Sequence, residues 1–153
     1  MKIALGSDEQ TTLTAQLIQS LKQRGHEVLL YGALADHDPQ TDWPLCSSNV
    51  AQAIATGQAE EGIVCCWTGT GAAIAANKVS GIRAALCHDA ETAKGARIWN
   101  HANVLALSLR TTSEAIANEI LDAWYSTPYS DDAWNHQQIE RIRALEQKGT
   151  SGT

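Results

Sequence analysis

Apolar and polar positions along this chain follow two rhythms, short apolar runs and longer stretches with a helical repeat. The first apolar run, KIALGS at 2–7, precedes a stretch in which Leu13, Leu17 and Leu21 recur at helical spacing before Gly25. The same alternation predicts strands over 2–7, 27–32, 61–67, 82–88 and 103–109. It predicts helices over 12–24, 46–56, 72–78, 90–98, 113–124 and 133–147, with a polar loop at 33–44.

Strands that alternate with helices in this way favour an α/β fold, in which a parallel sheet is covered on both faces. The predicted strands are apolar throughout, as expected for strands buried on both sides. We expect residues 1–147 to form one domain and residues 148–153 to form a flexible C-terminal tail. Ligands of such sheets bind beyond the carboxyl ends of the strands.

Composition narrows the range of partners and cofactors. The net charge is −6 and no basic cluster is visible, which argues against nucleic acid. No apolar run approaches the roughly 18 residues of a membrane span, and the N-terminus is unlike a signal peptide, so a cytoplasmic location is expected. The four cysteines show neither zinc-ligand spacing nor a disulfide framework, so we expect them to be thiols.

The stretch CCWTGTG at 65–71 closes the third predicted strand and enters a helix. Gly69 and Gly71 allow the backbone to turn sharply and to approach a ligand. N–H groups at the start of the helix then converge on one point, which suits a phosphate or an oxyanion. The spacing is neither that of a P-loop nor that of a dinucleotide fingerprint. By itself it also fits a simple tight turn between strand and helix.

Cys66 strengthens the functional interpretation of this turn. A thiol just before a helix N-terminus is in the environment that favours the thiolate. Such a thiolate can remove a proton from carbon, while the adjacent N–H groups hold the negative oxygen of an enediolate. Base and oxyanion donors together are the minimum needed to move a proton between neighbouring carbons of a sugar. The alternative is that Cys66 is an inert, buried hydrophobic residue.

The chain also resembles a known family over residues 1–147. The matching pieces are GSD (6–8), TDWP (41–44), CWTGTG (66–71), IAANKVSGIRAALCHD (74–89) and NVLA (103–106). They are similar to those of the sugar isomerases that include ribose-5-phosphate isomerase B and galactose-6-phosphate isomerase. The resemblance implies a Rossmann-like αβα sandwich with a five-stranded parallel sheet. It also implies a homodimer or homotetramer with active sites at subunit interfaces, where the C-terminal helix reaches the partner subunit.

Position by position, the resemblance implies roles for the following residues. Cys66 matches the base and Thr68 a hydroxyl beside it. The backbone of Trp67, Gly69, Thr70 and Gly71 matches the hole that binds the enediolate oxygen. Asp8 matches an acid that binds sugar hydroxyls, Asn100 a polar contact and Arg110 a phosphate contact.

Several matched positions depart from the family pattern. Glu9 and Trp99 stand at two positions where the family has histidine. The family also has an Asp after the second of these histidines, and His101 stands at that position. Glu9 and His101 are therefore the candidates for opening a sugar ring, unless the substrate is already an open chain. Asn135 and Ile139 stand where phosphate-binding arginines are expected. Either a phosphate is held by Arg110 and by Arg143, one turn beyond Ile139, or the substrate has no phosphate there.

Tryptophans gather at the matched pocket positions. Trp43, Trp67, Trp99 and Trp134 are predicted to line and narrow the pocket, although filling of a core or an interface is the alternative. We interpret the chain as an aldose–ketose isomerase that needs no metal and no cofactor and acts on a sugar or sugar phosphate other than ribose 5-phosphate. A non-catalytic sugar-binding homologue and an epimerase on the same scaffold are the alternatives.

Overall fold

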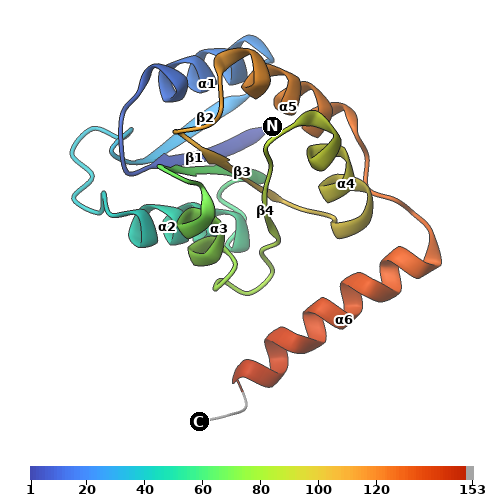
Figure 1. The fold of residues 1–153 in the computed structure, drawn as a ribbon. Coiled ribbons are helices and arrows are strands. Elements are labelled where there is room, and N and C mark those ends of the chain that lie inside the picture. Colours follow the sequence, from blue (N-terminus) through green and yellow to red (C-terminus); the bar gives the residue numbers. More distant parts are fainter. Residues whose placement is uncertain (151–153) are drawn as a thin grey trace.

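One parallel sheet with helices on both faces forms the body of the protein, as the alternating pattern predicts (Figure 1). The computed structural model describes residues 1–150. The strands are β1 Lys2–Ser7, β2 Glu27–Gly32, β3 Glu61–Cys66, β4 Ala84–Leu86 and β5 Val104–Ser108, in the spatial order β2-β1-β3-β5-β4. The helices are α1 Thr12–Gln23, α2 Trp43–Ala55, α3 Thr70–Ala76, α4 Ala90–Asn100, α5 Glu114–Ser126 and α6 Ala133–Thr150. This confirms the predicted Rossmann-like αβα architecture.

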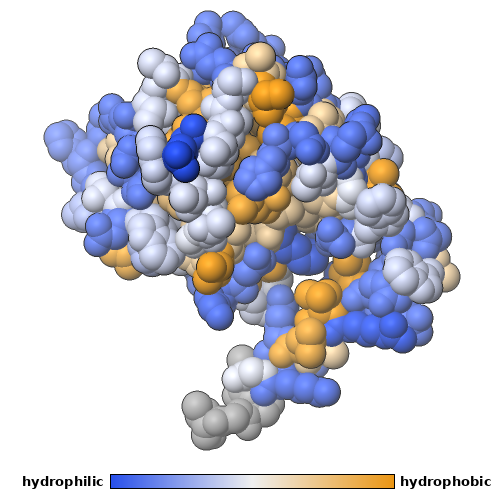
Figure 2. Space-filling view, in the orientation of Figure 1, coloured by the Kyte–Doolittle hydropathy of each residue, from blue (hydrophilic) through white to orange (hydrophobic). Residues whose placement is uncertain are grey.

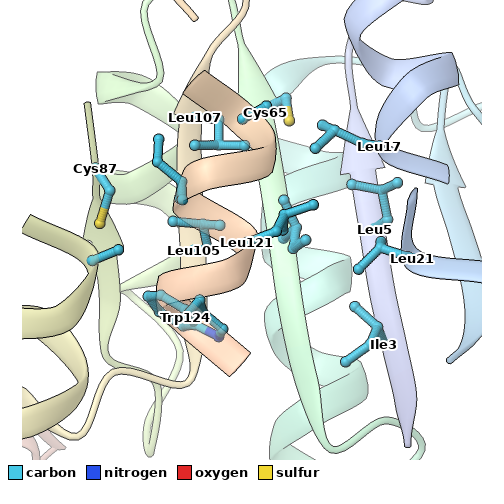
Figure 3. Close-up of a cluster of buried hydrophobic side chains, with 14 of the residues drawn as sticks. Ile3, Leu5, Leu17, Leu21, Cys65, Cys87, Leu105, Leu107, Leu121 and Trp124 are labelled. Carbon is cyan, nitrogen blue, oxygen red and sulfur yellow. The ribbon is translucent and has the colours of Figure 1, made fainter. Parts of the chain in front are cut away.

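The two faces of the sheet carry different cores. Helices α1, α4 and α5 cover one face, where large side chains such as Leu17, Leu121 and Trp124 are buried (Figure 3). Helices α2 and α3 cover the other face with smaller residues. There a Cβ on Gly62 would lie 2.7 Å from Cδ1 of Ile54, so the missing side chain lets α2 approach the sheet closely.

Some element boundaries differ from the predicted ones. Helix α2 begins at Trp43 and not at 46, because Pro44 is tolerated in the first turn of a helix, where no backbone donor is needed. Strand β4 is three residues long and lies at the sheet edge, whereas 82–88 was predicted. The side-chain amide of Asn77 donates to the Ala84 carbonyl and accepts from the Ala84 N–H, at 2.9 and 2.8 Å. These bonds occupy the backbone N–H and C=O groups of Ala84 on the open side of this edge strand.

Helix α6 extends away from the body (Figure 1). It continues to Thr150, so the predicted tail is helical over 148–150, and residues 151–153 of that tail lie outside the described residues. Glu146 fastens the helix to the loop before β4, because its carboxylate accepts from the Gly81 N–H at 3.0 Å and from the Ser80 hydroxyl at 3.1 Å. Within residues 1–150, no helix is apolar over a length sufficient to cross a membrane.

A buried ion pair joins β3 to the helices α4 and α5. Nη1 of Arg97 lies 2.8 Å from Oε1 of Glu61, and both side chains are only 11% exposed. The second carboxylate oxygen accepts from Nε1 of Trp124 at 2.7 Å. The guanidinium also donates to the carbonyl of Ala102 at 2.8 Å and lies over the Tyr129 ring. This network fixes the C-terminal part of α4 and the segment that leads into α6.

Candidate active site

The carboxyl edge of the sheet brings together the residues that follow three neighbouring strands. Cys65 pairs with Ser7 in the β1–β3 register, and Cys66 pairs with Ser108 in the β3–β5 register. Asp8 and Arg110, which follow β1 and β5, therefore lie at the same edge as the 66–71 turn. The N–H of Arg110 donates to the Trp67 carbonyl at 2.9 Å, which ties this turn to the end of β5.

The glycine-rich turn requires glycine at its centre. Gly69 is the N-cap of α3 and adopts φ 76°, the left-handed region that glycine tolerates best. A Cβ there would lie 2.9 Å from backbone atoms of both Leu107 and Ser108. No side chain among residues 1–150 caps the helix at Gly69, and the first N–H groups of a helix have no partner inside it. These N–H groups are the available oxyanion donors, with the hydroxyls of Thr68 and Thr70 2.8 Å apart beside them.

The two adjacent thiols face opposite sides of the sheet. Cys65 is fully buried in the core between α1 and α5, where burial raises the pKa of its thiol far above the ordinary value (Figure 3). Cys66 faces α2 and α3 and retains 5% exposure at the end of β3. Two further thiols are buried, and burial raises their pKa to about 11 for Cys46 and to about 12 for Cys87. Cys66 is thus the cysteine that the strand end brings beside the glycine-rich turn.

Acidic residues surround the end of β1. Burial raises the pKa of the Asp8 carboxyl, and the nearby carboxylates of Glu9 and Asp42 raise it further. Its Oδ1 atom is shielded from solvent and has no hydrogen-bond partner among residues 1–150. The Ser7 hydroxyl accepts from the Glu9 N–H at 3.2 Å and donates to the Glu9 carbonyl at 2.7 Å, which holds this acidic turn in place. Asp42 was missed in the sequence as a neighbour of Asp8, although it begins the DWP motif.

The remaining predicted site residues form a second group, at the end of α4 and on α6. Trp99 folds back over its own helix, where a Cβ on Gly95 would lie 2.9 Å from Cζ3 of the indole. The ring of His101 stacks on Tyr129 at 4.6 Å, and its Nε2 lies 3.0 Å from the Ser130 carbonyl. Burial lowers the pKa of His101, which is only 7% exposed.

In one chain these two groups lie at opposite edges of the sheet. Gly62 pairs with Val104 near the amino edge, where α4 ends, and Cys66 pairs with Ser108 at the carboxyl edge. At about 3.3 Å per residue, the two edges are about 13 Å apart along the strand. His101 is therefore not placed beside Cys66 of its own chain. Helix α6, which carries Asn135 and Ile139, packs against α4.

A cavity of about 870 Å³ belongs to the second group. It lies between β4, α4 and α6, and Trp99, Asn100 and Ile139 are among its lining residues. Figure 2 shows apolar side chains along α6 beside the hollow that separates this helix from the body. Arg141 lines the cavity, although helical spacing from Ile139 had favoured Arg143. Arg143 instead forms an ion pair with Glu140 of the same helix.

Within the part of the chain that the structure describes, no three His, Cys, Asp or Glu side chains are arranged to hold a metal ion. What the carboxyl edge offers is a thiol, backbone N–H groups, hydroxyls and carboxylates. This set is suited to proton transfer at a carbon next to a carbonyl.

Comparison with known proteins identifies the family. A family model described as Ribose/Galactose Isomerase matches residues 3–143. The chain belongs to this family. One relative in the ribose/galactose isomerase family is ribose-5-phosphate isomerase B of Escherichia coli (strain K12), 40% identical over 149 residues that cover 96% of this chain and 97% of the relative. Another is D-erythrulose-4-phosphate isomerase of Pectobacterium atrosepticum, 36% identical with 93% of each chain covered.

A solved structure of the ribose/galactose isomerase family has the same fold. Ribose-5-phosphate isomerase B of Clostridium thermocellum matches with a TM-score of 0.88 at 36% identity, covering 97% of this chain and 99% of its own. The resemblance predicted from the sequence motifs is confirmed. This chain is thus a member of a family of sugar phosphate isomerases, and its named relatives differ in the sugar on which they act.

Proposed function

We propose that this protein is an aldose–ketose isomerase that transfers a proton between neighbouring carbons of a sugar through a cis-enediolate. The thiolate of Cys66 removes the proton next to the carbonyl, and the electron pair moves onto the carbonyl oxygen. N–H groups of the 67–71 turn hold that oxygen, which takes up the proton of the neighbouring hydroxyl group. The Cys66 thiol returns its proton to the carbon that carried the carbonyl, and the carbonyl forms again at the neighbouring carbon. Asp8 accepts hydrogen bonds from sugar hydroxyls, and the Thr68 hydroxyl lies next to the reacting carbons.

The observation that carries this proposal is the position of Cys66. It is the last residue of β3, directly before a turn that glycine alone can form and whose N–H groups are free of side-chain caps in the described chain. Trp99, Asn135 and Ile139 occupy positions where the resemblance expects His and Arg. They support a substrate other than ribose 5-phosphate.

The experiment that tests the base is exchange of the substrate's α-proton with deuterated water, followed by NMR. Cys66→Ala is expected to abolish exchange while leaving the fold intact by circular dichroism. Cys65→Ala is the matched control, because that thiol lies on the opposite face of the sheet and should leave exchange in place. Exchange retained in the Cys66→Ala variant would exclude Cys66 as the base.

The same measurement separates the alternatives. A sugar-binding homologue without catalysis would exchange no proton with any sugar that it binds. An epimerase would exchange the proton but return a C2 epimer instead of the ketose, which NMR analysis of the product identifies. Ketose formed from aldose is the outcome expected here.

We also propose that two copies of the chain build each active site. The second group of residues cannot reach Cys66 within one chain, and large apolar side chains are exposed on both groups. At the carboxyl edge these are Trp43, Leu45, Trp67 and Ile74, between 43 and 59% exposed. On the second group they are Trp99, Trp134, Ile142 and Leu145, between 44 and 64% exposed. In a two-fold dimer, the exposed apolar side chains at the carboxyl edge of each subunit cover those of the second group of its partner, so the same contact forms twice. This arrangement suits a homodimer or a homotetramer.

Mixing two inactive variants tests this pairing. Cys66→Ala removes the base, and the double variant Trp99→Ala, Asn100→Ala removes the second group. If each site takes residues from both subunits, mixed dimers contain one intact site, and about a quarter of wild-type activity should return after subunit exchange. Activity that stays at zero, or a monomer in sedimentation velocity, would contradict shared sites.

A further inference from the structure

Two arginines line the cavity of the second group without forming an ion pair. Arg83 directly precedes β4 and Arg141 lies on α6, and both belong to the wall of this cavity of about 870 Å³. In the described part of the chain neither pairs with a carboxylate, whereas Arg24, Arg97 and Arg143 each do. Two guanidinium groups therefore border one hollow with their charges unmatched.

The guanidinium of Arg83 is held in place by neutral groups. Its Nε donates to the His101 carbonyl at 2.8 Å and its Nη1 to the Gly81 carbonyl at 3.4 Å, and the Tyr129 hydroxyl is a further neighbour. A guanidinium carries five N–H donors, so these contacts leave others available for a ligand. Burial lowers the pKa of Arg83, because the charged form has lost part of its water. An anion in the cavity would compensate this loss.

Arg141 is oriented by a neighbouring amide on α6. Its Nη1 donates to Oε1 of Gln138 at 3.0 Å, and Nε2 of Gln138 donates to the Trp134 carbonyl at 3.3 Å. Gln138 also lines the cavity. One nitrogen of the Arg141 guanidinium is thus engaged, and the remaining donors keep the planar arrangement that binds phosphate oxygens in pairs.

The two carboxylates of the cavity wall already have partners. Glu91 forms an ion pair with Lys94 at 2.6 Å. Glu146 accepts from the Gly81 N–H and the Ser80 hydroxyl. When Lys94 is counted beside Glu91, positive charges outnumber negative ones around the cavity. The cavity therefore favours an anionic ligand.

Positions 135 and 139, where the resemblance expects arginines, do not supply this charge. Nδ2 of Asn135 donates to Oδ2 of Asp132 at 2.7 Å, and its Oδ1 has no hydrogen-bond partner among residues 1–150. Ile139 is apolar and lines the same cavity as Arg141. The α6 wall of the cavity thus retains an arginine, but at another position of the helix.

We propose that the substrate is a sugar phosphate whose phosphate group is bound by Arg141 and Arg83. This inference rests on the isomerase activity and on the subunit pairing proposed above. Phosphate oxygens only accept hydrogen bonds, and two guanidinium groups supply both the donors and the opposite charge. Trp99 and Asn100 line the same cavity, so the carbon chain extends past them towards Cys66 of the partner subunit. Arg141 and Arg83 determine the specificity for the charged end of the sugar.

Binding of inorganic phosphate tests the two arginines without any need for catalysis. Isothermal titration calorimetry is expected to show binding to the wild-type protein, weakened about tenfold or more in Arg141→Gln and in Arg83→Gln, an effect of about 1.4 kcal/mol. Lys148→Gln is the matched control, because it removes the same charge from an exposed position of α6 that does not line the cavity. Equal binding by all four proteins, or none by the wild type, would overturn the phosphate site.

Kinetics with phosphate esters give a second readout. Deuterium exchange is measured with ribose 5-phosphate, D-erythrulose 4-phosphate and galactose 6-phosphate, and with the three free sugars. Arg141→Gln is expected to raise the KM of the fastest ester about tenfold with little change in kcat, because a contact made equally in ground and transition states is lost. Arg141→Lys should recover part of this loss, since it keeps the charge but not the paired donors. The KM of the free sugar should not change.

The results distinguish this inference from the isomerase proposal. If the wild type prefers the free sugar, or if both glutamine variants leave the KM of the ester unchanged, the assignment of Arg141 and Arg83 is overturned and the isomerase stands. If no compound exchanges while inorganic phosphate still binds through the arginines, the isomerase proposal is overturned and the anion site stands. If Arg83→Gln does not fold by circular dichroism, the Arg141 variants decide.

Discussion

The indole ring of Trp43 rests against Gly71, so that a Cβ on Gly71 would lie 2.9 Å from Cε3 of the ring. Two further ring atoms would lie within 3.2 Å of the same Cβ. The first residue of α2 and the second residue of α3 are thus in direct contact across the glycine-rich turn. This contact makes Trp43, which is 43% exposed, one wall of the candidate active site.

Gly71→Ala is therefore expected to destabilise the protein by about 1–3 kcal/mol, because the added methyl group displaces the ring. In a Trp43→Ala background, the effect of Gly71→Ala on the free energy of unfolding should change from destabilising to stabilising. Alanine is then the better helix residue by about 0.5–1 kcal/mol, and nothing obstructs it. Urea unfolding of the wild-type protein, the two single variants and the double variant checks this prediction. An equal cost in both backgrounds would show that the ring does not limit the position.

Gly69→Ala is expected to lower the free energy of unfolding by several kcal/mol. This is more than the strain of an alanine in the left-handed conformation would cause by itself. Gly57 has the same φ of 76° but open space around its Cα, so Gly57→Ala should cost only the strain, about 1–2 kcal/mol. The difference reflects the backbone of β5, which cannot move aside for a new Cβ. Urea unfolding compares the two variants, and the proton-exchange assay should show lost activity for Gly69→Ala only. Equal unfolding midpoints would mean that the turn can shift away from β5.

Asp8→Asn is expected to raise stability at pH 7 and to lower activity. Because burial raises the pKa of Asp8 above its unfolded value near 3.8, the folded state favours the protonated carboxyl. The wild-type protein therefore loses stability from this group as the pH rises through the raised pKa, and the Asn variant does not. Urea midpoints measured from pH 4 to pH 7 should diverge as the pH increases. Curves that stay parallel would show that Asp8 titrates in the same way when folded and unfolded.

Arg97→Met is expected to cost about 3–5 kcal/mol, since it leaves the Glu61 carboxylate buried without its partner. The double variant Glu61→Gln, Arg97→Met should recover a large part of this loss. Lys94→Met is the control on the same helix, because the Lys94–Glu91 pair is largely exposed and should contribute less than about 1 kcal/mol. Thermal unfolding of the wild-type protein and these three variants measures the differences. A similar cost for Lys94→Met would point to helix propensity and not to charge burial.

Much of the carboxyl-edge site could be predicted from the sequence. Cys66 and the glycines that follow it are neighbours in the chain, and parallel strands place their carboxyl ends at one edge. Adjacent residues of a strand face opposite sides, which separates the roles of Cys65 and Cys66. The start of α2 was predicted too late, because Pro44 suggested a loop where it in fact occupies the first helical turn.

The location of the second group could not be predicted in the same way. Helix α4 returns from the carboxyl edge to the amino edge, so its length decides where Trp99, Asn100 and His101 lie. The predicted end at 98 and the observed end at Asn100 differ by two residues. The ring of His101 was a candidate acid or base in the sequence, and its bond to Ser130 depends on how the 127–132 segment packs against α4.

By itself, the sequence determined the parallel α/β fold, the family and a thiol placed directly before a glycine turn. These features depend on local periodicity and on spacing between neighbours in the chain. Only the tertiary structure decided that the predicted site residues fall into two groups at opposite sheet edges, and that Asn135 keeps an acceptor free. Such facts depend on the direction and length of whole helices and on which partner occupies each polar atom.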